Sequence, residues 1–180
     1  MYSQKIVLWK DRIGALIGKN GRNKDILEKR LEVKISINSR TGEVTVKCDD
    51  LEKSMRAINV IRAVNYGFSP ERAFRLLDEN QILNVIDINA FIGKSPKDLI
   101  RVKGRLIGER GKTRRLIEET TKVYLSVYSH FVAVIGSFEN VLTATEAVKR
   151  LIKGAPHKSV YNPLFYERRI EKLKMAKLWE

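Results

Sequence analysis

The sequence contains two copies of one unit, and this internal repeat constrains the fold more than any other feature. A shift of 90 residues aligns a series of identical residues. Among them are Leu16 and Leu106, Ile17 and Ile107, Gly18 and Gly108, Gly21 and Gly111, Glu28 and Glu118, Val33 and Val123, and Ser36 and Ser126. Because a repeated sequence folds into a repeated structural unit, we expect two similar domains.

Hydrophobic periodicity predicts the same order of elements in both copies. In the first copy, the apolar residues of segment 26–31 have helical spacing, whereas those of segment 33–37 alternate as in a half-buried strand. The full order is strand, helix, helix, strand, strand, helix. The last helix of the first copy follows Asp49 and Asp50, either of which is a suitable cap. Its expected buried face consists of Leu51, Met55, Ile58, Ile61 and Val64.

The charge of the chain indicates a polyanionic partner. The 180 residues include 35 Lys and Arg against 21 Asp and Glu, a formal net charge of +14. A field of this sign attracts nucleic acid. The sequence has no apolar run near the roughly 18 residues of a membrane-spanning helix, and no signal peptide. We therefore expect a cytoplasmic protein that binds nucleic acid and no membrane.

Few side chains in the sequence are suited to catalysis or metal binding. Cys48 is the only cysteine, and His130 and His157 are the only histidines. These residues are too few for a zinc site or a nucleophilic triad, so we expect no enzyme activity, no metal and no cofactor. Cys48 is expected to be buried, and both histidines are expected at the surface.

A Gly-x-x-Gly loop occurs in each copy. The segment Leu16-Ile17-Gly18-Lys19-Asn20-Gly21 recurs as Leu106-Ile107-Gly108-Glu109-Arg110-Gly111, each time between two predicted helices. The loop, the flanking helices and the following strand together resemble the type I KH domain, which binds single-stranded RNA. Glycine would allow the sugar-phosphate backbone to approach the loop closely.

This resemblance implies a set of RNA-binding residues in each copy. In the first they are Ile17, Gly18, Lys19, Asn20, Gly21, Arg22, Lys24 and Ile35. In the second they are Lys103, Gly104, Arg105, Ile107, Gly108, Arg110, Gly111, Lys112, Thr113, Arg114, Arg115 and Leu125. The basic residues would contact phosphate, while the four aliphatic ones form either the floor of a base-binding groove or ordinary core. The second copy carries the denser charge and is expected to bind RNA more strongly, although Glu109 has no assigned role.

The resemblance to one KH family covers nearly the whole chain. It rests on the connector Gly67-Phe68-Ser69-Pro70-Glu71-Arg72-Ala73, on Val102-Lys103-Gly104-Arg105 before the second loop, and on His157-Lys158-Ser159-Val160-Tyr161. These segments are similar to the archaeal branch of the ribosome-assembly proteins called partner-of-Nob. The family implies binding near the 3′ end of the small-subunit ribosomal RNA precursor, beside the endonuclease that trims it.

The expected fold class is α+β, with four segments. Residues 1–66 and 83–155 would form the two type I KH domains, residues 67–82 a short helical connector, and residues 156–180 a basic amphipathic tail helix. The tail either packs on the body or contacts RNA or a partner.

Two other functions fit the sequence. The first is a KH adaptor for an RNA-degrading exosome. The second is a protein-interaction scaffold with only one active RNA site, whose partner would be the nuclease or a translation initiation factor.

If the basic residues contact phosphate, affinity for a short single-stranded RNA will fall steeply with added salt. Each neutralised phosphate releases condensed counterions, which gives a slope of about −0.7 per contact in a plot of log affinity against log salt concentration. Fluorescence anisotropy across a salt series measures this slope. A flat titration would contradict phosphate recognition.

Overall fold

The structure, a computed structural model, describes residues 2–177 and divides into two compact units at residues 83 and 84. Residues 178–180 of the predicted tail helix, including Leu178, lie outside the described residues.

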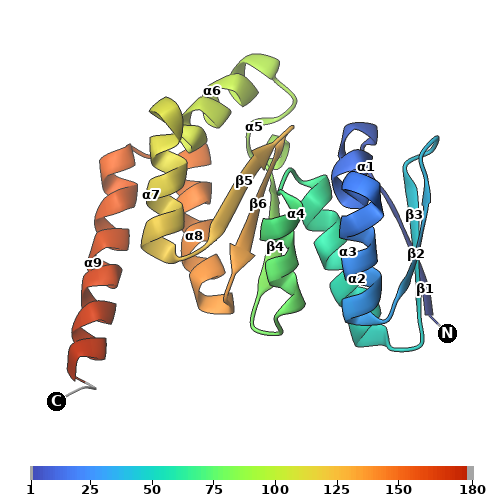
Figure 1. Cartoon of the computed structure of the whole chain (residues 1–180). Coiled ribbons are helices and arrows are strands. Elements are labelled where there is room, and N and C mark those ends of the chain that lie inside the picture. The colour runs from blue at the N-terminus through green and yellow to red at the C-terminus, as the bar shows by residue number, and fades with distance from the viewer. Residues whose placement is uncertain (1, 178–180) are drawn as a thin grey trace. The chain divides into compact units, whose positions relative to one another are not determined.

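The first unit contains one complete copy of the repeat. Its elements are β1 (Tyr2–Val7), α1 (Lys10–Ile17), the 3-10 turn η1 (Lys19–Gly21), α2 (Arg22–Leu31), β2 (Lys34–Asn38), β3 (Glu43–Cys48), α3 (Leu51–Asn65), α4 (Pro70–Ala73) and the 3-10 turn η2 (Phe74–Leu77). The three strands form an antiparallel sheet in the order β1-β3-β2. Helices α1, α2 and α3 lie on one side of this sheet (Figure 1).

The second unit repeats this arrangement and adds a tail helix. Its elements are β4 (Ile82–Asp87, which begins at the junction), α5 (Asn89–Ile92), α6 (Pro96–Ile107), the 3-10 turn η3 (Glu109–Gly111), α7 (Lys112–Thr121), β5 (Tyr124–Tyr128), β6 (Phe131–Gly136), α8 (Phe138–Ile152) and α9 (His157–Lys177). The sheet order is β4-β6-β5. The predicted α+β class and the predicted element order are both confirmed.

Alternating apolar residues on the strands build the core of each unit. In the first unit, Ile35 on β2 lies opposite Val46 on the central strand β3, and both are buried. In the second, Leu125 on β5 lies opposite Val134 on β6, again with both buried. The two edge strands β2 and β5 therefore direct equivalent side chains toward the helices.

The buried face of α3 differs from the expected one. Leu51 and Met55 are 46% and 53% exposed, whereas Ser54 and Ala57 are fully buried. Small side chains allow the helix to approach its neighbours closely, so the face with serine and alanine turns inward. The prediction was therefore wrong for the first two turns of α3 and correct for Ile61 and Val64, which are buried.

The connector is packed against its own unit. Phe68, Ala73 and Leu76 are buried, and both α4 and η2 contact α3. This packing follows from the apolar character of the segment, which lacks the Gly and Ser content of a flexible linker.

The start of α6 has the cap that the sequence predicts. Pro96 occupies the first turn, and the Ser95 hydroxyl accepts a hydrogen bond from the Asp98 N–H at 3.3 Å. The Arg101 guanidinium donates to the Asp98 carboxylate at 3.1 Å. The hydrogen bond with the Arg101 side chain lowers the pKa of the Asp98 carboxyl most, and a hydrogen bond with the Ser95 side chain lowers it further.

None of the helices formed by residues 2–177 has both the length and the hydrophobicity needed to cross a lipid bilayer.

The N-cap of α3 gives a stability prediction with an internal control. Asp50 Oδ1 accepts hydrogen bonds from the backbone N–H groups of Glu52 (2.8 Å) and Lys53 (3.2 Å). At the equivalent N-cap of α8, within the described residues, the Ser137 side chain makes no capping bond. Asp50→Ala is therefore expected to lower the free energy of unfolding by about 1 kcal/mol, and Ser137→Ala by much less. Urea unfolding followed by circular dichroism measures both, and equal effects would contradict the assignment.

Candidate nucleic-acid interface

The two Gly-x-x-Gly loops have the same backbone conformation. The first glycine has φ 74° and ψ 174° at Gly18, and φ 71° and ψ 173° at Gly108. The third loop residue is left-handed in both copies, with φ 55° at Asn20 and 50° at Arg110. Only glycine adopts the first of these conformations readily. The repeat in sequence is therefore a repeat of loop geometry.

The first glycine of each loop lies against the helix that follows. A Cβ atom added to Gly18 would come within 2.6 Å of the Asn23 side chain. A Cβ atom at Gly108 would lie 2.3 Å from Thr113 Oγ1 and 2.7 Å from its backbone nitrogen. The first glycine is thus required by the protein's own packing, whereas the sequence suggested only the approach of RNA.

The second glycine of each loop faces open space. A Cβ atom at Gly111 would meet nothing within 4 Å, and one at Gly21 would meet only the Asp25 carboxylate at 3.9 Å. Gly104, on the helix before the second loop, is also exposed with nothing near it. These positions have room for a close backbone partner, as the sequence predicts for RNA.

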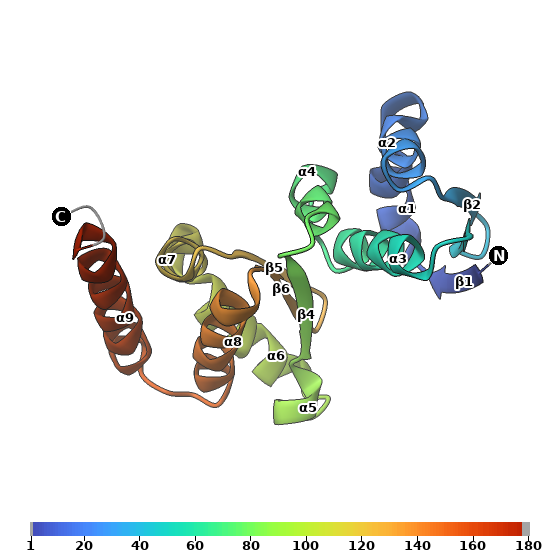
Figure 2. The same cartoon turned by 90° about the horizontal axis from the view of Figure 1, so that it is seen from below.

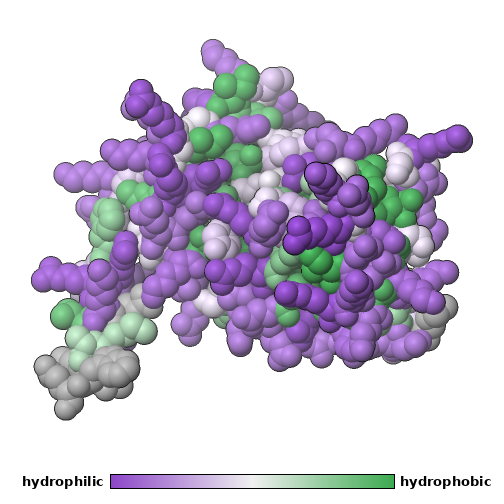
Figure 3. Space-filling model, in the orientation of Figure 1, coloured by the Kyte–Doolittle hydropathy of each residue, from purple (hydrophilic) through white to green (hydrophobic). Residues whose placement is uncertain are grey.

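Exposed polar and charged side chains surround both loops. Lys19, Asn20 and Arg22 are exposed in the first copy, and Arg110 and Lys112 in the second. Hydrophilic side chains also dominate the face of the molecule in Figure 3. Each loop opens directly onto the first turn of a helix, α2 or α7, whose free N–H groups favour an anion.

The four aliphatic site residues fall into two classes. Ile17 and Ile107, beside the loops, are partly exposed. Ile35 and Leu125, on the edge strands, are only 3% and 1% exposed. The strand residues are therefore core, and of the four only the isoleucines that precede the loops present exposed surface.

A carboxylate lies between helix and edge strand in each copy. Glu28 accepts a hydrogen bond from the Ile35 N–H at 2.7 Å, and Glu118 accepts one from the Leu125 N–H at 2.8 Å. Lys24 pairs with Glu28 at 3.2 Å. Both glutamates thus occupy an N–H group of an edge strand, which fixes the strand to the helix that follows the loop.

Arg114 takes the place of Lys24 in the second copy, and its Nε lies 4.0 Å from Glu118. The basic residues that the sequence predicts at this position therefore lie beside a carboxylate. Their side chains pair with a glutamate on the same helix and also add positive charge beside the loop.

The Arg105 side chain is hydrogen-bonded to the C-terminal end of α8. Its guanidinium donates to the carbonyl oxygens of Leu151, at 3.3 Å, and Ala155. In the first unit Arg12 makes the corresponding bonds to Val64 (2.8 Å) and Phe68 (2.7 Å) at the end of α3. Both arginines cap a helix C-terminus. The position equivalent to Arg105 in the first copy is Ala15, and Arg12 lies one helical turn before it. The alignment of the repeat therefore does not show that the two arginines have the same role.

The remaining site residues belong to the loop or to the helices beside it. Lys103, on α6, is partly exposed, and Thr113, on α7, is buried below the first loop glycine. Arg115 is exposed, and its guanidinium donates to the Arg110 carbonyl at 2.7 Å. This hydrogen bond holds the left-handed residue of the second loop.

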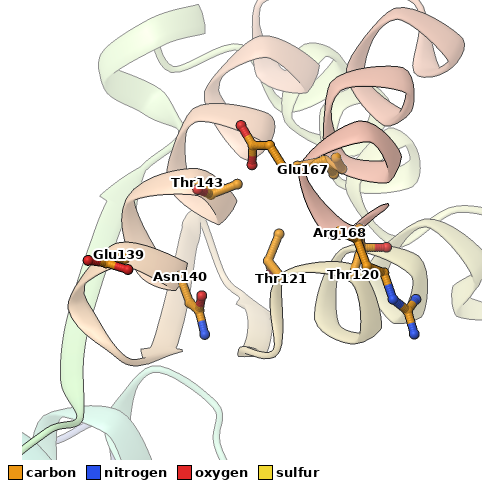
Figure 4. A pocket seen from close by; sticks show the side chains of 8 residues that line it. Thr120, Thr121, Glu139, Asn140, Thr143, Glu167 and Arg168 are labelled. Carbon is orange, nitrogen blue, oxygen red and sulfur yellow. The ribbon is translucent and has the colours of Figure 1, made fainter. Parts of the chain in front are cut away.

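Two of the hollows that the tail helix lines in the second unit also border the loop helix α7. One, of about 210 Å³, is bounded by side chains of α7, α8 and α9, among them Thr121, Thr143 and Glu167 (Figure 4). The other, of about 330 Å³, joins Lys112 and Arg115 to Phe165 on α9. The sequence did not predict that the tail would border the loop helix, because no local pattern marks that contact.

The structure contains no group of three or more His, Cys, Asp or Glu residues placed to hold a metal ion, among the residues that it describes.

The two glycines of one loop are expected to tolerate alanine differently. Gly111→Ala adds only the strain of a left-handed alanine, about 1 kcal/mol. Gly108→Ala adds a clash with Thr113 to a glycine-only conformation and should cost about 3 kcal/mol or more. The free energy of unfolding of each variant tests this order. Equal losses would mean that residue 113 does not restrict the first glycine.

Comparison with known proteins identifies the family. Residues 82–169 match the family described as eukaryotic type KH-domain, KH-domain type I. A KH domain-containing protein of Methanocaldococcus jannaschii is 42% identical over 177 residues, which cover 95% of this chain and 76% of that protein. The pre-rRNA-processing protein PNO1 of Chaetomium thermophilum is 31% identical over 159 residues, covering 86% of this chain but only 56% of that protein.

A solved structure agrees with these sequence relatives. The crystal structure of the a/eIF2α–aDim2p–rRNA complex from Pyrococcus horikoshii contains a chain that matches with a TM-score of 0.87 and 40% identity, covering 93% of this chain and 94% of that one. The matches to the Methanocaldococcus jannaschii protein and to aDim2p extend over both copies of the repeat. The chain therefore belongs to the PNO1/Dim2 family of ribosome-assembly KH proteins.

Proposed function

We propose that the protein binds single-stranded RNA through its Gly-x-x-Gly loops, without catalysis, and acts in small ribosomal subunit assembly near the 3′ end of the rRNA precursor. The observation that carries the proposal is the pair of loops with one backbone conformation. Each has an open second glycine at the start of a helix and exposed basic residues around it. A phosphate fits this environment because it needs close approach, N–H donors and positive charge.

The names of the relatives support rRNA as the RNA that this protein binds. The eukaryotic relative is named a pre-rRNA-processing protein, and aDim2p was crystallised with rRNA and a/eIF2α. We propose rRNA and a translation initiation factor as partners of this chain on that ground. The trimming endonuclease and a cytoplasmic location remain part of the proposal through the family resemblance and the sequence.

One substitution between the copies favours the second loop as the main RNA site. Asp25 in the first copy occupies the position of Arg115 in the second. Its carboxylate is the nearest group to the open face of Gly21, whereas nothing lies within 4 Å of that face at Gly111. A carboxylate there repels phosphate, and a guanidinium attracts it.

Charge reversal in the loops tests both the function and the ranking. Replacing Glu109 and Arg110 by aspartate is expected to weaken binding of single-stranded RNA from the 3′ end of the precursor by at least about tenfold. The fold should survive, because aspartate tolerates the left-handed conformation of residue 110. Replacing Lys19 and Asn20 by aspartate should weaken binding less. Fluorescence anisotropy measures affinity, and circular dichroism confirms folding.

The comparison controls for net charge, because the first-loop variant loses more positive charge than the second-loop variant. A smaller loss of RNA affinity for the first-loop variant would therefore place the main RNA site in the second copy. A larger effect would place the main site in the first copy. If neither variant changes the affinity, the loops do not bind RNA.

A further inference from the structure

The tail helix is hydrogen-bonded to the base of the second loop. His157 Nε2 lies 3.0 Å from the carbonyl oxygen of Arg105, and the Tyr161 hydroxyl donates to Thr113 Oγ1 at 2.9 Å. We call His157 and Tyr161 the tail anchor. It joins α9 to the last turn of α6 and the first turn of α7, on the two sides of the loop.

Packing holds the tail anchor in place. Val160 and Leu164 lie on the same stripe of α9 as the anchor, and they are only 1% and 4% exposed. Helix α9 contacts α7 and α8, beside which it lies in Figure 2. Arg150 of α8 also donates to the Ser159 carbonyl at 3.1 Å. The first two turns of the tail are therefore a fixed part of the second unit.

The first copy satisfies the same loop position without a tail. Asn23 Nδ2 donates to the carbonyl oxygen of Ala15 at 2.9 Å. Ala15 and Asn23 are the counterparts of Arg105 and Thr113 in the repeat. In both copies this carbonyl is in the last turn of a helix, where it has no partner within the helix. In the first copy Asn23 alone supplies a hydrogen bond to this carbonyl oxygen, whereas in the second copy the partner comes from the tail anchor.

Thr113 transmits the position of the tail to the loop. It is the residue whose side chain and backbone approach the first glycine, Gly108, most closely. A shift of Thr113 or of the end of α6 therefore changes the space in which Gly108 adopts its restricted conformation. The tail anchor fixes both sides of that space.

We propose that His157 and Tyr161 are positioning residues for RNA binding, which hold the second Gly-x-x-Gly loop in its binding conformation without contacting RNA. This inference rests on the RNA-binding function proposed above. A loop that is ordered before binding loses less conformational entropy on binding, so the anchor raises affinity.

The double variant His157→Ala, Tyr161→Phe removes both hydrogen bonds. We expect about tenfold weaker RNA binding, because the loop then has to be ordered by the RNA itself. Amide hydrogen exchange at residues 108–112 should become faster, while exchange at residues 18–22 stays unchanged. The first loop is thus an internal control in the same molecule.

A third substitution distinguishes positioning from simple damage to the tail. Adding Thr113→Asn to the double variant supplies an amide that can donate to the Arg105 carbonyl, as Asn23 does to Ala15. We expect RNA affinity to return to within about threefold of the parent protein. Slow exchange in the second loop should return with it, although the tail remains unanchored. Failure of this rescue in a folded protein would overturn the proposal.

A charge control tests direct contact between the tail and RNA. Arg169→Gln with Lys172→Gln removes two exposed tail charges and leaves the anchor intact. If this control weakens RNA binding more than the anchor variant does, and the anchor variant leaves loop exchange unchanged, the tail acts by direct contact and the proposal is wrong. If the parent protein does not bind RNA but loop exchange responds to the anchor variant, the RNA function fails while the loop support stands.

Discussion

The close approach of the first loop glycine to the residue five positions later restricts the geometry of each Gly-x-x-Gly loop. Asn23 or Thr113 lies where any side chain on Gly18 or Gly108 would have to be. At this contact the chain passes from one helix into the next, and the second glycine of each loop has open space at its Cβ position. The end of the first helix leaves its last carbonyl groups in need of donors, which the two copies supply in different ways.

The repeated fold could be predicted from the sequence because the patterns that specify each element are local and occur in both copies. Helical and alternating patterns specify the order of elements, and turn residues separate them. The face of α3 was predicted less well, because apolar spacing alone does not show that Ser54 and Ala57 allow closer packing than Leu51 and Met55. Periodicity thus predicts a helix better than it predicts which of two adjacent faces is buried.

The candidate site was predictable where it depends on the loop and not where it depends on distant residues. His157 was expected at the surface, yet its ring reaches Arg105, 52 positions earlier in the chain. Arg105 was expected to contact RNA, yet its guanidinium caps α8. A basic residue near such a loop can either contact a phosphate or cap a helix C-terminus. Only the structure shows whether a helix C-terminus is within its reach.

The coupling that we propose between the tail and the second loop would act in both directions. If an attached tail favours the RNA-binding conformation of the loop, RNA bound to the loop must favour the attached tail by the same free energy. The same holds for any partner that binds the outer surface of α9, where Phe165 and Tyr166 are 48% and 67% exposed. A partner that displaces the tail anchor would weaken RNA binding, and one that needs the anchored tail would strengthen it. The first loop, supported from within by Asn23, would respond to neither. Under this proposal only the RNA affinity of the second copy would depend on a neighbouring helix.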